Sequence, residues 1–257
     1  MKTAVILVDL QREFFKERRL TGNKSALVTA VNELNQFARS KNIPIIWVRQ
    51  EFKKDLSDAP IGSKMPGLII PIKGTNGSKL LEGLIVKKQD KEIIKKRYSA
   101  FFKTDLDQIL KDLGVETLII GGVNTHACIR ATVIDAYQLD YPVTIASDCT
   151  DSYDKEHSDM SMKYMRRNIA TVKTNKEIID TLTQARSSGA FITYKGKHLL
   201  MLRDDYPNIK NPNTWSILGG VTEDGETREE CLLRELKEEG NIIVTDYKLL
   251  FDHPSGE

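Results

Sequence analysis

Residues 121–130 read GGVNTHACIR and join a predicted strand to a predicted helix. The apolar run 116–120 precedes them, and apolar positions at helical spacing continue through Leu139. A cysteine at such a turn lies near unpaired backbone N–H groups and the positive end of the helix dipole, and both favour its thiolate form. Because a single cysteine is more often a buried and inert core residue, position alone leaves the role of Cys128 open.

Strands and helices alternate on both sides of this segment. Continuous apolar runs predict buried strands at 4–8, 43–48, 116–120, 143–146 and in short pieces within 83–95. Helical spacing predicts helices at 25–39, at 106–113 capped by Thr104, at 127–139 and near 155–167 and 175–185. Such alternation is typical of an α/β fold with a doubly wound parallel sheet and helices on both faces. Residues 51–79, rich in Pro, Gly and Ser, predict an irregular excursion that could form a lid or an oligomer contact.

The pattern changes at residues 186–189, which we interpret as the seam between a first domain, 1–184, and a second, 189–257. The second domain combines short apolar runs, a turn signal and a glutamate-rich stretch, which together predict a small α+β module. Its predicted elements are a hairpin of 190–194 and 198–202 turning at 195–197, a helix from about Thr227 to Glu239, and a strand from Ile242.

The composition limits the possible partners. The chain has 257 residues, a net charge of +2 and interspersed charges, which argues against a nucleic-acid or anionic-membrane binder. Its three cysteines form no short pairing motif, as is usual in a reducing compartment. It begins with a predicted strand rather than a signal peptide and has no apolar stretch of membrane-spanning length. We therefore expect a cytoplasmic protein that acts on a small molecule and has no nucleic-acid or membrane partner.

Three chemically distinct residues are expected to meet at one edge of the sheet. Asp9 ends the first predicted strand, Lys95 ends an isoleucine-rich one, and Cys128 follows the central one. The carboxylate could take the thiol proton, the ammonium could stabilise the thiolate, and N–H groups of the turn could bind an oxyanion. Taken singly, these residues could be a cap, a surface charge and a core residue. Their convergence favours a catalytic set.

Three separated motifs carry a family resemblance. They are VDLQ at 8–11, KKRYSAFFKTDL at 95–106 and GVNTHAC at 122–128. Together they resemble the isochorismatase-like cysteine hydrolases, a superfamily that includes nicotinamidases and N-carbamoyl amidases. The resemblance covers residues 1 to about 184 and implies the doubly wound fold described above.

The resemblance also implies an activity. Asp9, Lys95 and Cys128 match the family's catalytic Asp, Lys and Cys, and the Arg-Tyr-Ser-Ala-Phe run selects Lys95 over Lys96. The implied reaction is cysteine-dependent hydrolysis of a small amide or related C–N substrate. Family members act on amide, carbamoyl and vinyl-ether substrates, so the fold does not name the molecule. A homo-oligomer formed through the first domain is also expected.

The turn before the cysteine is the expected binding element. The resemblance implies a non-proline cis peptide between Val123 and Asn124, of the kind found where backbone N–H groups must be aimed. We expect oxyanion or substrate contacts from Asn124, Thr125 and His126. For His126 the alternative is a structural role, which is more common for a lone histidine in a turn.

One departure from the family limits the substrate. Metal-dependent nicotinamidases carry an Asp and two His after the second strand, whereas residues 47–54 here read WVRQEFKK. The segment has no histidine, so we expect no metal cofactor in the first domain and regard nicotinamidase activity as disfavoured.

A second motif lies in the glutamate-rich region. It resembles the Nudix box, G-x5-E-x7-R-E-U-x-E-E-x-G-U with U aliphatic. Asn241 stands in place of the last glycine and tolerates the same left-handed backbone. The matching residues are Gly220, Glu226, Arg234, Glu235, Leu236, Glu238, Glu239 and Ile242.

The spacing of the glutamates has a chemical consequence. Glu235, Glu238 and Glu239 lie on adjacent helical turns and would repel one another unless a cation neutralised them. Their oxygen ligands suit Mg²⁺ or Mn²⁺, and such a metal could polarise a diphosphate and activate water. Arg234 is expected to orient one of the carboxylates. The alternative is a solvated, glutamate-rich helix without a metal.

Residues 189–257 are fewer than a Nudix domain normally needs, so we expect a partial module. Three functions stay open. The chain could be a cysteine hydrolase with a Nudix-type appendage, a Nudix hydrolase of a nucleoside diphosphate derivative, or a protein whose second module only senses a nucleotide or binds a partner.

Overall fold

The computed structural model describes residues 2–18, 23–64, 70–183, 187–206, 211–223, 226–248 and 250. The chain divides into two compact units, Met1–Leu182 and Thr183–Glu257, and each is described by itself. The predicted seam residue Arg186 and the predicted helix end at 184–185 lie outside the described residues. No helix in the described ranges is long and apolar enough to cross a membrane.

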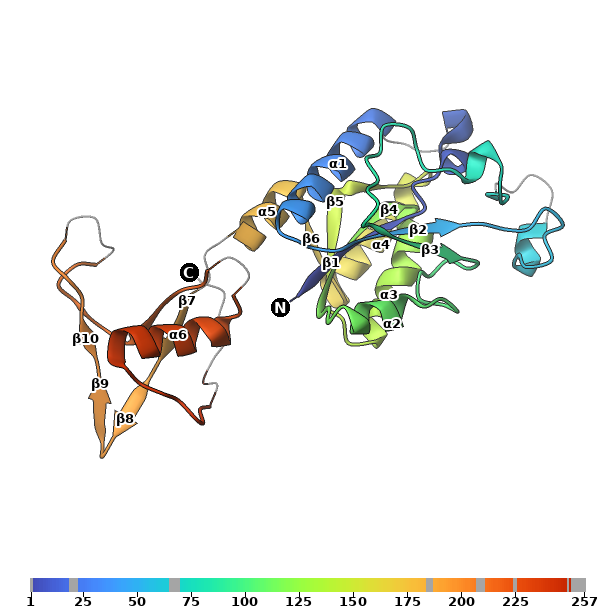
Figure 1. Ribbon diagram of the computed structural model, residues 1–257. Coiled ribbons are helices and arrows are strands. Elements are labelled where there is room, and N and C mark those ends of the chain that lie inside the picture. Colours follow the sequence, from blue (N-terminus) through green and yellow to red (C-terminus); the bar gives the residue numbers. More distant parts are fainter. Residues whose placement is uncertain are drawn as a thin grey trace. The chain divides into compact units, whose positions relative to one another are not determined.

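The first unit is built on a parallel sheet with the strand order β3-β2-β1-β4-β5-β6 (Figure 1). Two consecutive halves run outward from the central pair β1 and β4, which is the doubly wound arrangement predicted from the sequence. The strands are β1 (Thr3–Val8), β2 (Ile45–Gln50), β3 (Lys91–Lys95), β4 (Thr117–Val123), β5 (Val143–Asp151) and β6 (Thr171–Lys173).

Helices cover both faces of this sheet because each carries a stripe of apolar residues. One core cluster joins the sheet to α1 and α5, and the other joins it to α2, α3 and α4. In α1, Leu27, Val31 and Leu34 recur at helical spacing and are buried. The helices are α1 (Lys24–Ser40), α2 (Leu106–Asp112), α3 (Arg130–Gln138), α4 (Lys155–Asn168) and α5 (Asn175–Thr183).

Three details differ from the sequence prediction. Strand β6 was not predicted, because its three residues are too few to show an apolar pattern. The helix after residue 124 starts as a single π-type turn, Thr125–Ile129, before α3 begins. The N-cap position of α2 belongs to Asp105 rather than Thr104, although the Thr104 hydroxyl accepts the Leu106 N–H at 3.3 Å.

The register of the parallel strands brings distant residues to one edge. Val8 pairs with Val48 of β2 and with Gly122 of β4, and Lys95 at the end of β3 pairs with Gln50 at the end of β2. The residue after β1, the end of β3 and the turn after β4 therefore share the carboxyl edge of the sheet, where ligands of such folds bind.

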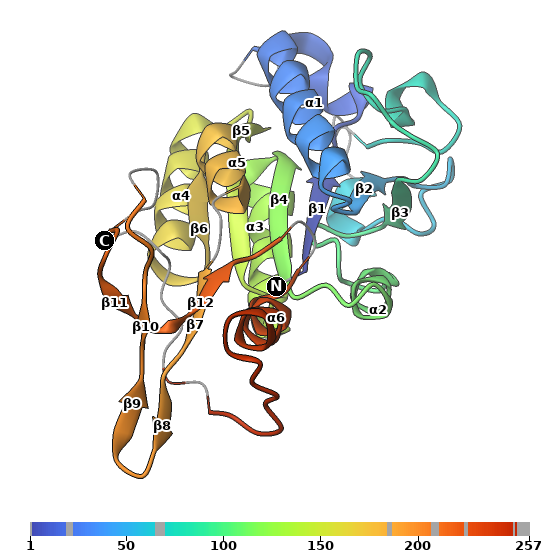
Figure 2. The same cartoon turned by 60° about the vertical axis from the view of Figure 1, so that its left-hand side comes forward.

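The described part of the second unit consists of short antiparallel strand pairs and one helix, α6 (Arg228–Gly240), which packs on the β7–β12 pair (Figure 2). The predicted hairpin is confirmed for residues 192–199, with a turn at Lys195 and Gly196. Its outer residues pair elsewhere, because Ala190 pairs with Leu218 and residues 201–202 pair with residues 215–216. The pairs are β7 (Ser187–Ala190) with β12 (Leu218–Val221), β8 (Ile192–Tyr194) with β9 (Lys197–Leu199), and β10 (Met201–Leu202) with β11 (Trp215–Ser216).

The ends of α6 follow local rules. Thr227 and Glu230 form a reciprocal capping box at its start, and Asn241 closes it in the left-handed conformation. The prediction of a strand from Ile242 is wrong for the described residues up to 248, which contain no strand. The Ile242 N–H instead donates to the Leu236 carbonyl and completes the helix end.

Close approach of β4 to β1 explains a glycine in the decisive segment. Gly122 has a φ of +126°, and a Cβ atom placed there would lie 2.0 Å from the Val8 carbonyl oxygen. Only a residue without a side chain fits both the backbone angle and the space. Gly122 thus lets the central strands pair up to the point where Asp9 begins.

We predict that Gly122→Ala lowers the free energy of unfolding of the chain by more than about 3 kcal/mol. The matched control is Gly74→Ala, where φ is +80° but no atom lies within 4 Å of the new Cβ. The control should cost only about 1–2 kcal/mol, the penalty of the backbone angle. Urea unfolding measures both, and equal losses would show that the contact with Val8 is unimportant.

Candidate active site

The structure brings Asp9, Lys95 and Cys128 together at the carboxyl edge of the sheet. Lys95 Nζ lies 2.7 Å from Asp9 Oδ2 and 3.4 Å from Cys128 Sγ. Asp9 and Lys95 have no exposed surface, and Cys128 is 3% exposed. A buried ammonium thus lies within hydrogen-bond distance of both groups that could carry a negative charge.

The backbone around each of the three residues fixes its position. Asp9 leaves β1 in the left-handed region, with φ at +56°, and its N–H donates to the Val48 carbonyl at 2.8 Å. Lys95 also donates to the Arg97 carbonyl at 3.0 Å. The Cys128 carbonyl accepts the Thr132 hydroxyl at 2.7 Å, which fixes the turn that carries Cys128 against α3. The peptide bond between Val123 and Asn124 is cis, as the resemblance implied.

Burial sets the protonation of the three groups. Burial raises the pKa of Asp9, although the Lys95 ammonium opposes this shift. Burial works against the charged form of Lys95, but the negative charges of Asp9 and Cys128 raise its pKa overall. Burial, followed by the negative charge of Asp9, raises the pKa of Cys128 to about 12, and Lys95 only partly offsets these effects.

The prediction that Cys128 favours its thiolate is therefore wrong for the resting protein. The turn and the helix dipole were expected to dominate, but burial beside an ionised Asp9 outweighs them. One ammonium compensates one negative charge, so Asp9 and Cys128 share a single negative charge.

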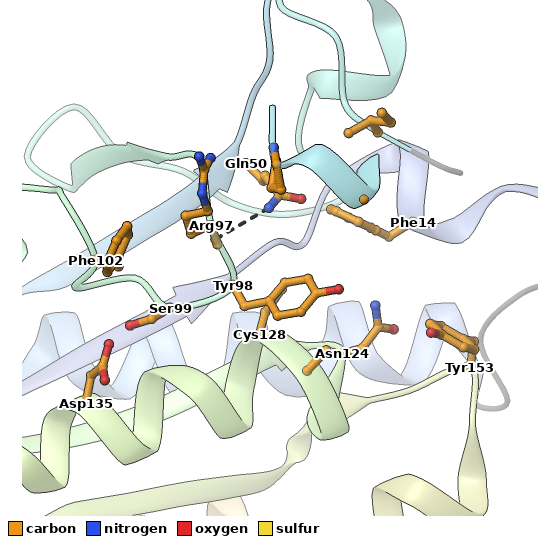
Figure 3. Close-up of a pocket in the computed structure, with 14 residues that line it drawn as sticks. Phe14, Gln50, Arg97, Tyr98, Ser99, Phe102, Asn124, Cys128, Asp135 and Tyr153 are labelled. Carbon is orange, nitrogen blue, oxygen red and sulfur yellow. Dashed lines mark hydrogen bonds between the residues drawn. The ribbon is translucent and has the colours of Figure 1, made fainter. Parts of the chain in front are cut away.

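A cavity of about 700 Å³ opens over Cys128 (Figure 3). Its walls are part aromatic and part polar, so they suit a small organic molecule with a few hydrogen-bonding groups. The aromatic lining is Phe14, Tyr98, Phe102 and Tyr153; the polar lining is Gln50, Arg97, Ser99, Asn124 and Asp135.

The predicted excursion supplies part of the cavity wall. Pro60, Gly62 and Ile70 come from this segment. The excursion is attached to the strand end that carries Lys95, since Lys96 Nζ forms an ion pair with Asp58 Oδ2 at 2.9 Å. Its action as a lid stays a prediction.

The three residues of the binding turn have different surroundings. Asn124 lines the cavity, whereas the Thr125 hydroxyl donates to the Asp151 carbonyl at 3.1 Å. His126 Nδ1 lies 2.6 Å from the Ser152 hydroxyl oxygen, and its ring meets Tyr153 edge-on. The side chains of Thr125 and His126 therefore form hydrogen bonds with the end of β5 and the residue that follows it. Their expected role in substrate binding stays a prediction.

Two glutamines of the site were not predicted. Gln11 Nε2 donates to the carbonyls of Gln50 and Ser78, both at 2.9 Å, and its Oε1 accepts the Gln50 N–H at 2.8 Å. Gln50 then reaches the cavity from the end of β2. Gln11 belongs to the VDLQ motif, but nothing in the sequence indicated Gln50 except its place at a strand end.

The Nudix-box glutamates of the second unit are held by an arginine. Arg234 forms ion pairs with Glu226 at 2.8 Å, Glu235 at 2.7 Å and Glu238 at 3.2 Å. The expected repulsion between the carboxylates is thus compensated within the chain. In the ranges that the structure describes, no group of three or more His, Cys, Asp or Glu side chains is placed to hold a metal ion.

Two of these glutamates face the neighbouring strand. The Glu235 carboxylate lies so close to Gly220 that a Cβ there would be 2.0 Å from Glu235 Oε1. Glu239 Oε2 accepts the Gly219 N–H at 3.1 Å. Both carboxylates therefore lie beside the glycine pair of β12.

Comparison with known proteins agrees with this geometry. The family model of the isochorismatase domain matches residues 3–177, which is more than half of the chain. The chain belongs to the isochorismatase family. The model of the NUDIX domain matches residues 183–256, so the isochorismatase domain is followed by a Nudix domain.

Individual relatives cover the isochorismatase domain. A probable inactive nicotinamidase of Arabidopsis thaliana is 40% identical over 58% of this chain and 80% of its own length. A cysteine hydrolase from Pseudomonas syringae pv. phaseolicola is 26% identical, with a TM-score of 0.62 over 69% of this chain and 91% of that one. An N-carbamoylsarcosine amidase from Thermoplasma acidophilum is 26% identical, with a TM-score of 0.57 over 68% and 97%.

We predict that the Cys128 thiol stays protonated up to about pH 10 in the wild type, since its pKa is about 12. In Asp9→Asn only the positive charge of Lys95 remains beside Sγ, so the pKa of Cys128 should fall and thiolate should appear nearer neutral pH. The titration of Cys128 in both proteins is followed by the ultraviolet absorbance of the thiolate, taken as the difference from Cys128→Ala. A wild-type titration at the ordinary thiol pKa of about 8.5, unchanged in Asp9→Asn, would contradict the coupling.

Proposed function

We propose that the isochorismatase domain is a cysteine-dependent hydrolase of a small amide or related C–N substrate. The observation that carries this proposal is the buried Lys95 ammonium, 2.7 Å from Asp9 and 3.4 Å from Cys128, beneath a cavity of about 700 Å³. The three groups supply a base, a positive charge and a nucleophile.

The first half of the reaction forms a covalent intermediate. Asp9 accepts the Sγ proton while Sγ attacks the substrate carbonyl carbon, and Lys95 keeps its positive charge beside the reacting sulfur. The tetrahedral adduct then collapses. Asp9 returns the proton to the departing nitrogen, the C–N bond breaks, and an acyl group stays on Cys128 as a thioester.

The second half releases the acid. Asp9, again a carboxylate, accepts a proton from a water molecule whose oxygen attacks the thioester carbonyl. The C–S bond breaks and Sγ takes the proton back from Asp9, which restores the resting state. A pKa raised by burial suits Asp9 to both accept and donate a proton during the reaction.

We predict that Cys128→Ala and Asp9→Asn each lower amide hydrolysis by at least about 1,000-fold, because each removes a group that takes part in bond making. Ammonia release from benzamide, nicotinamide and N-carbamoylglycine by the full chain is the measurement. EDTA should leave the activity unchanged, because residues 47–54 lack the family's histidine ligands.

Circular dichroism of Cys128→Ala should match the wild type, since this substitution removes only the sulfur and leaves the ion pair of Lys95 with Asp9 intact. Amide hydrolysis that persists in Cys128→Ala, or that EDTA removes and Zn²⁺ or Mn²⁺ restores, would overturn the proposed mechanism.

We also propose that the Nudix domain binds Mg²⁺ or Mn²⁺ through Glu235 and Glu239, with Glu238 nearby. Support comes from the position of two carboxylates beside Gly219 and Gly220, since carboxylate oxygens are the ligands these ions prefer. The ion would compete with Arg234 for Glu235, so weak binding is expected. Turnover of a nucleoside diphosphate derivative is the alternative function of the chain and depends on this metal.

Thermal unfolding of the full chain tests the metal site. Millimolar Mn²⁺ should raise the temperature at which the second unit unfolds in the wild type, because a ligand that binds only the folded state stabilises it. The double variant Glu235→Gln/Glu239→Gln should show no rise, and Glu229→Gln, on the same helix, is the control. A rise of equal size in the double variant would exclude these ligands.

A further inference from the structure

Two carboxamide side chains of the cavity have unused hydrogen-bonding capacity. Asn124 is 8% exposed and Gln50 is 7% exposed. Asn124 Oδ1 is buried and has no hydrogen-bond partner among the described residues, and the side-chain hydrogen bond of Gln50 to the Arg97 carbonyl uses only its Nε2. An unpaired polar group costs about 1–3 kcal/mol when it is buried, so the carboxamide of Asn124, together with that of Gln50 on the same cavity, points to a polar ligand near Cys128.

The orientation of Asn124 makes it a donor. Its Oδ1 atom is fully buried, and its Nδ2 end faces the cavity (Figure 3). Asn124 lies at the start of the turn that carries Cys128. A carbonyl oxygen bound at the nucleophile could therefore accept a hydrogen bond from Asn124 Nδ2.

The orientation of Gln50 makes it an acceptor. Its Nε2 donates to the Arg97 carbonyl at 3.4 Å, and the same carbonyl accepts Lys95 Nζ at 3.0 Å. Gln50 is thus tied to the atom that also holds the ammonium beside Cys128, while its Oε1 stays available. The backbone N–H of Gln50 donates to Gln11 Oε1, so the position from which the Gln50 side chain reaches the cavity is fixed.

We infer that Gln50 Oε1 and Asn124 Nδ2 together recognise a planar group that offers one N–H donor and one carbonyl acceptor. A primary carboxamide or a ureido group has this pattern, whereas an ester or a vinyl ether has no N–H to donate. Gln50 is then the residue that selects nitrogen-bearing substrates over oxygen analogues, an inference that rests on the proposed function of the same site. A site that hydrogen-bonds an N–H group discriminates strongly against an analogue without it.

Alkylation of Cys128 tests this without a known substrate. The probes are chloroacetamide and methyl chloroacetate, in which Sγ attacks the CH₂ carbon and chloride leaves. Chloroacetamide carries the N–H group that Gln50 would bind, whereas methyl chloroacetate has an ester oxygen in its place. Intact-mass spectrometry of the full chain gives the alkylation rate of each probe, and peptide mapping assigns the modification to Cys128. Each rate is then divided by the rate of the same probe with glutathione, which corrects for the intrinsic reactivity of the probe.

The wild type should favour chloroacetamide by about tenfold after this correction, the size expected for one hydrogen bond to a buried group. Gln50→Met should abolish the preference by slowing only the amide probe. Asn124→Leu should slow both probes, since both carry a carbonyl oxygen. Gln108→Met, an exposed position on α2, is the matched control and should change neither rate.

The outcomes separate this inference from the proposed function. A corrected ratio near one in the wild type, or a ratio that Gln50→Met leaves unchanged, would overturn the recognition by Gln50 even if Cys128-dependent hydrolysis is found. A Gln50-dependent preference in a chain that hydrolyses no amide would uphold the recognition and reject the hydrolase.

Discussion

The first unit depends on one buried positive charge. Lys95 has no exposed surface, and an isolated ammonium in such a place is strongly unfavourable. It is retained because Asp9 lies 2.7 Å away and the Arg97 carbonyl accepts a further hydrogen bond. Because the ammonium carries one positive charge, it compensates only one negative charge on Asp9 and Cys128 together. A proton shared between carboxylate and thiol follows directly from this constraint.

The strand register and two local backbone features hold Lys95 beside its partners. The strand register sets the end of β1 beside the ends of β2 and β4, and the end of β3 beside Gln50. Gly122 permits the close approach of β4 to Val8, and the left-handed backbone at Asp9 turns its carboxylate toward Lys95. Each of these features is local, yet the three reactive groups meet only when all are present.

The sequence predicts the parallel sheet and the meeting of Asp9, Lys95 and Cys128, because buried strands and their end residues are visible as apolar runs followed by polar side chains. It misjudges the protonation of Cys128, since burial by distant segments has no local signal. Gln50 is missed for the same reason, because its position at the cavity depends on contacts with Gln11 and Arg97. In the second unit the sequence predicts a helix from about Thr227 and one carboxylate oriented by Arg234, but not the ion pairs of Arg234 with three glutamates.

The pH dependence of kcat/KM for a hydrolysed amide tests the shared proton most directly. Asp9 must be ionised to take the thiol proton, and burial raises its pKa above the usual 3.8. The rate should therefore fall as the pH drops through this raised pKa, and should stay level toward alkaline pH because Lys95 keeps its charge and the pKa of Cys128 is about 12. A rate that instead rises as an ordinary thiol ionises, at about pH 8.5, would contradict proton transfer to Asp9.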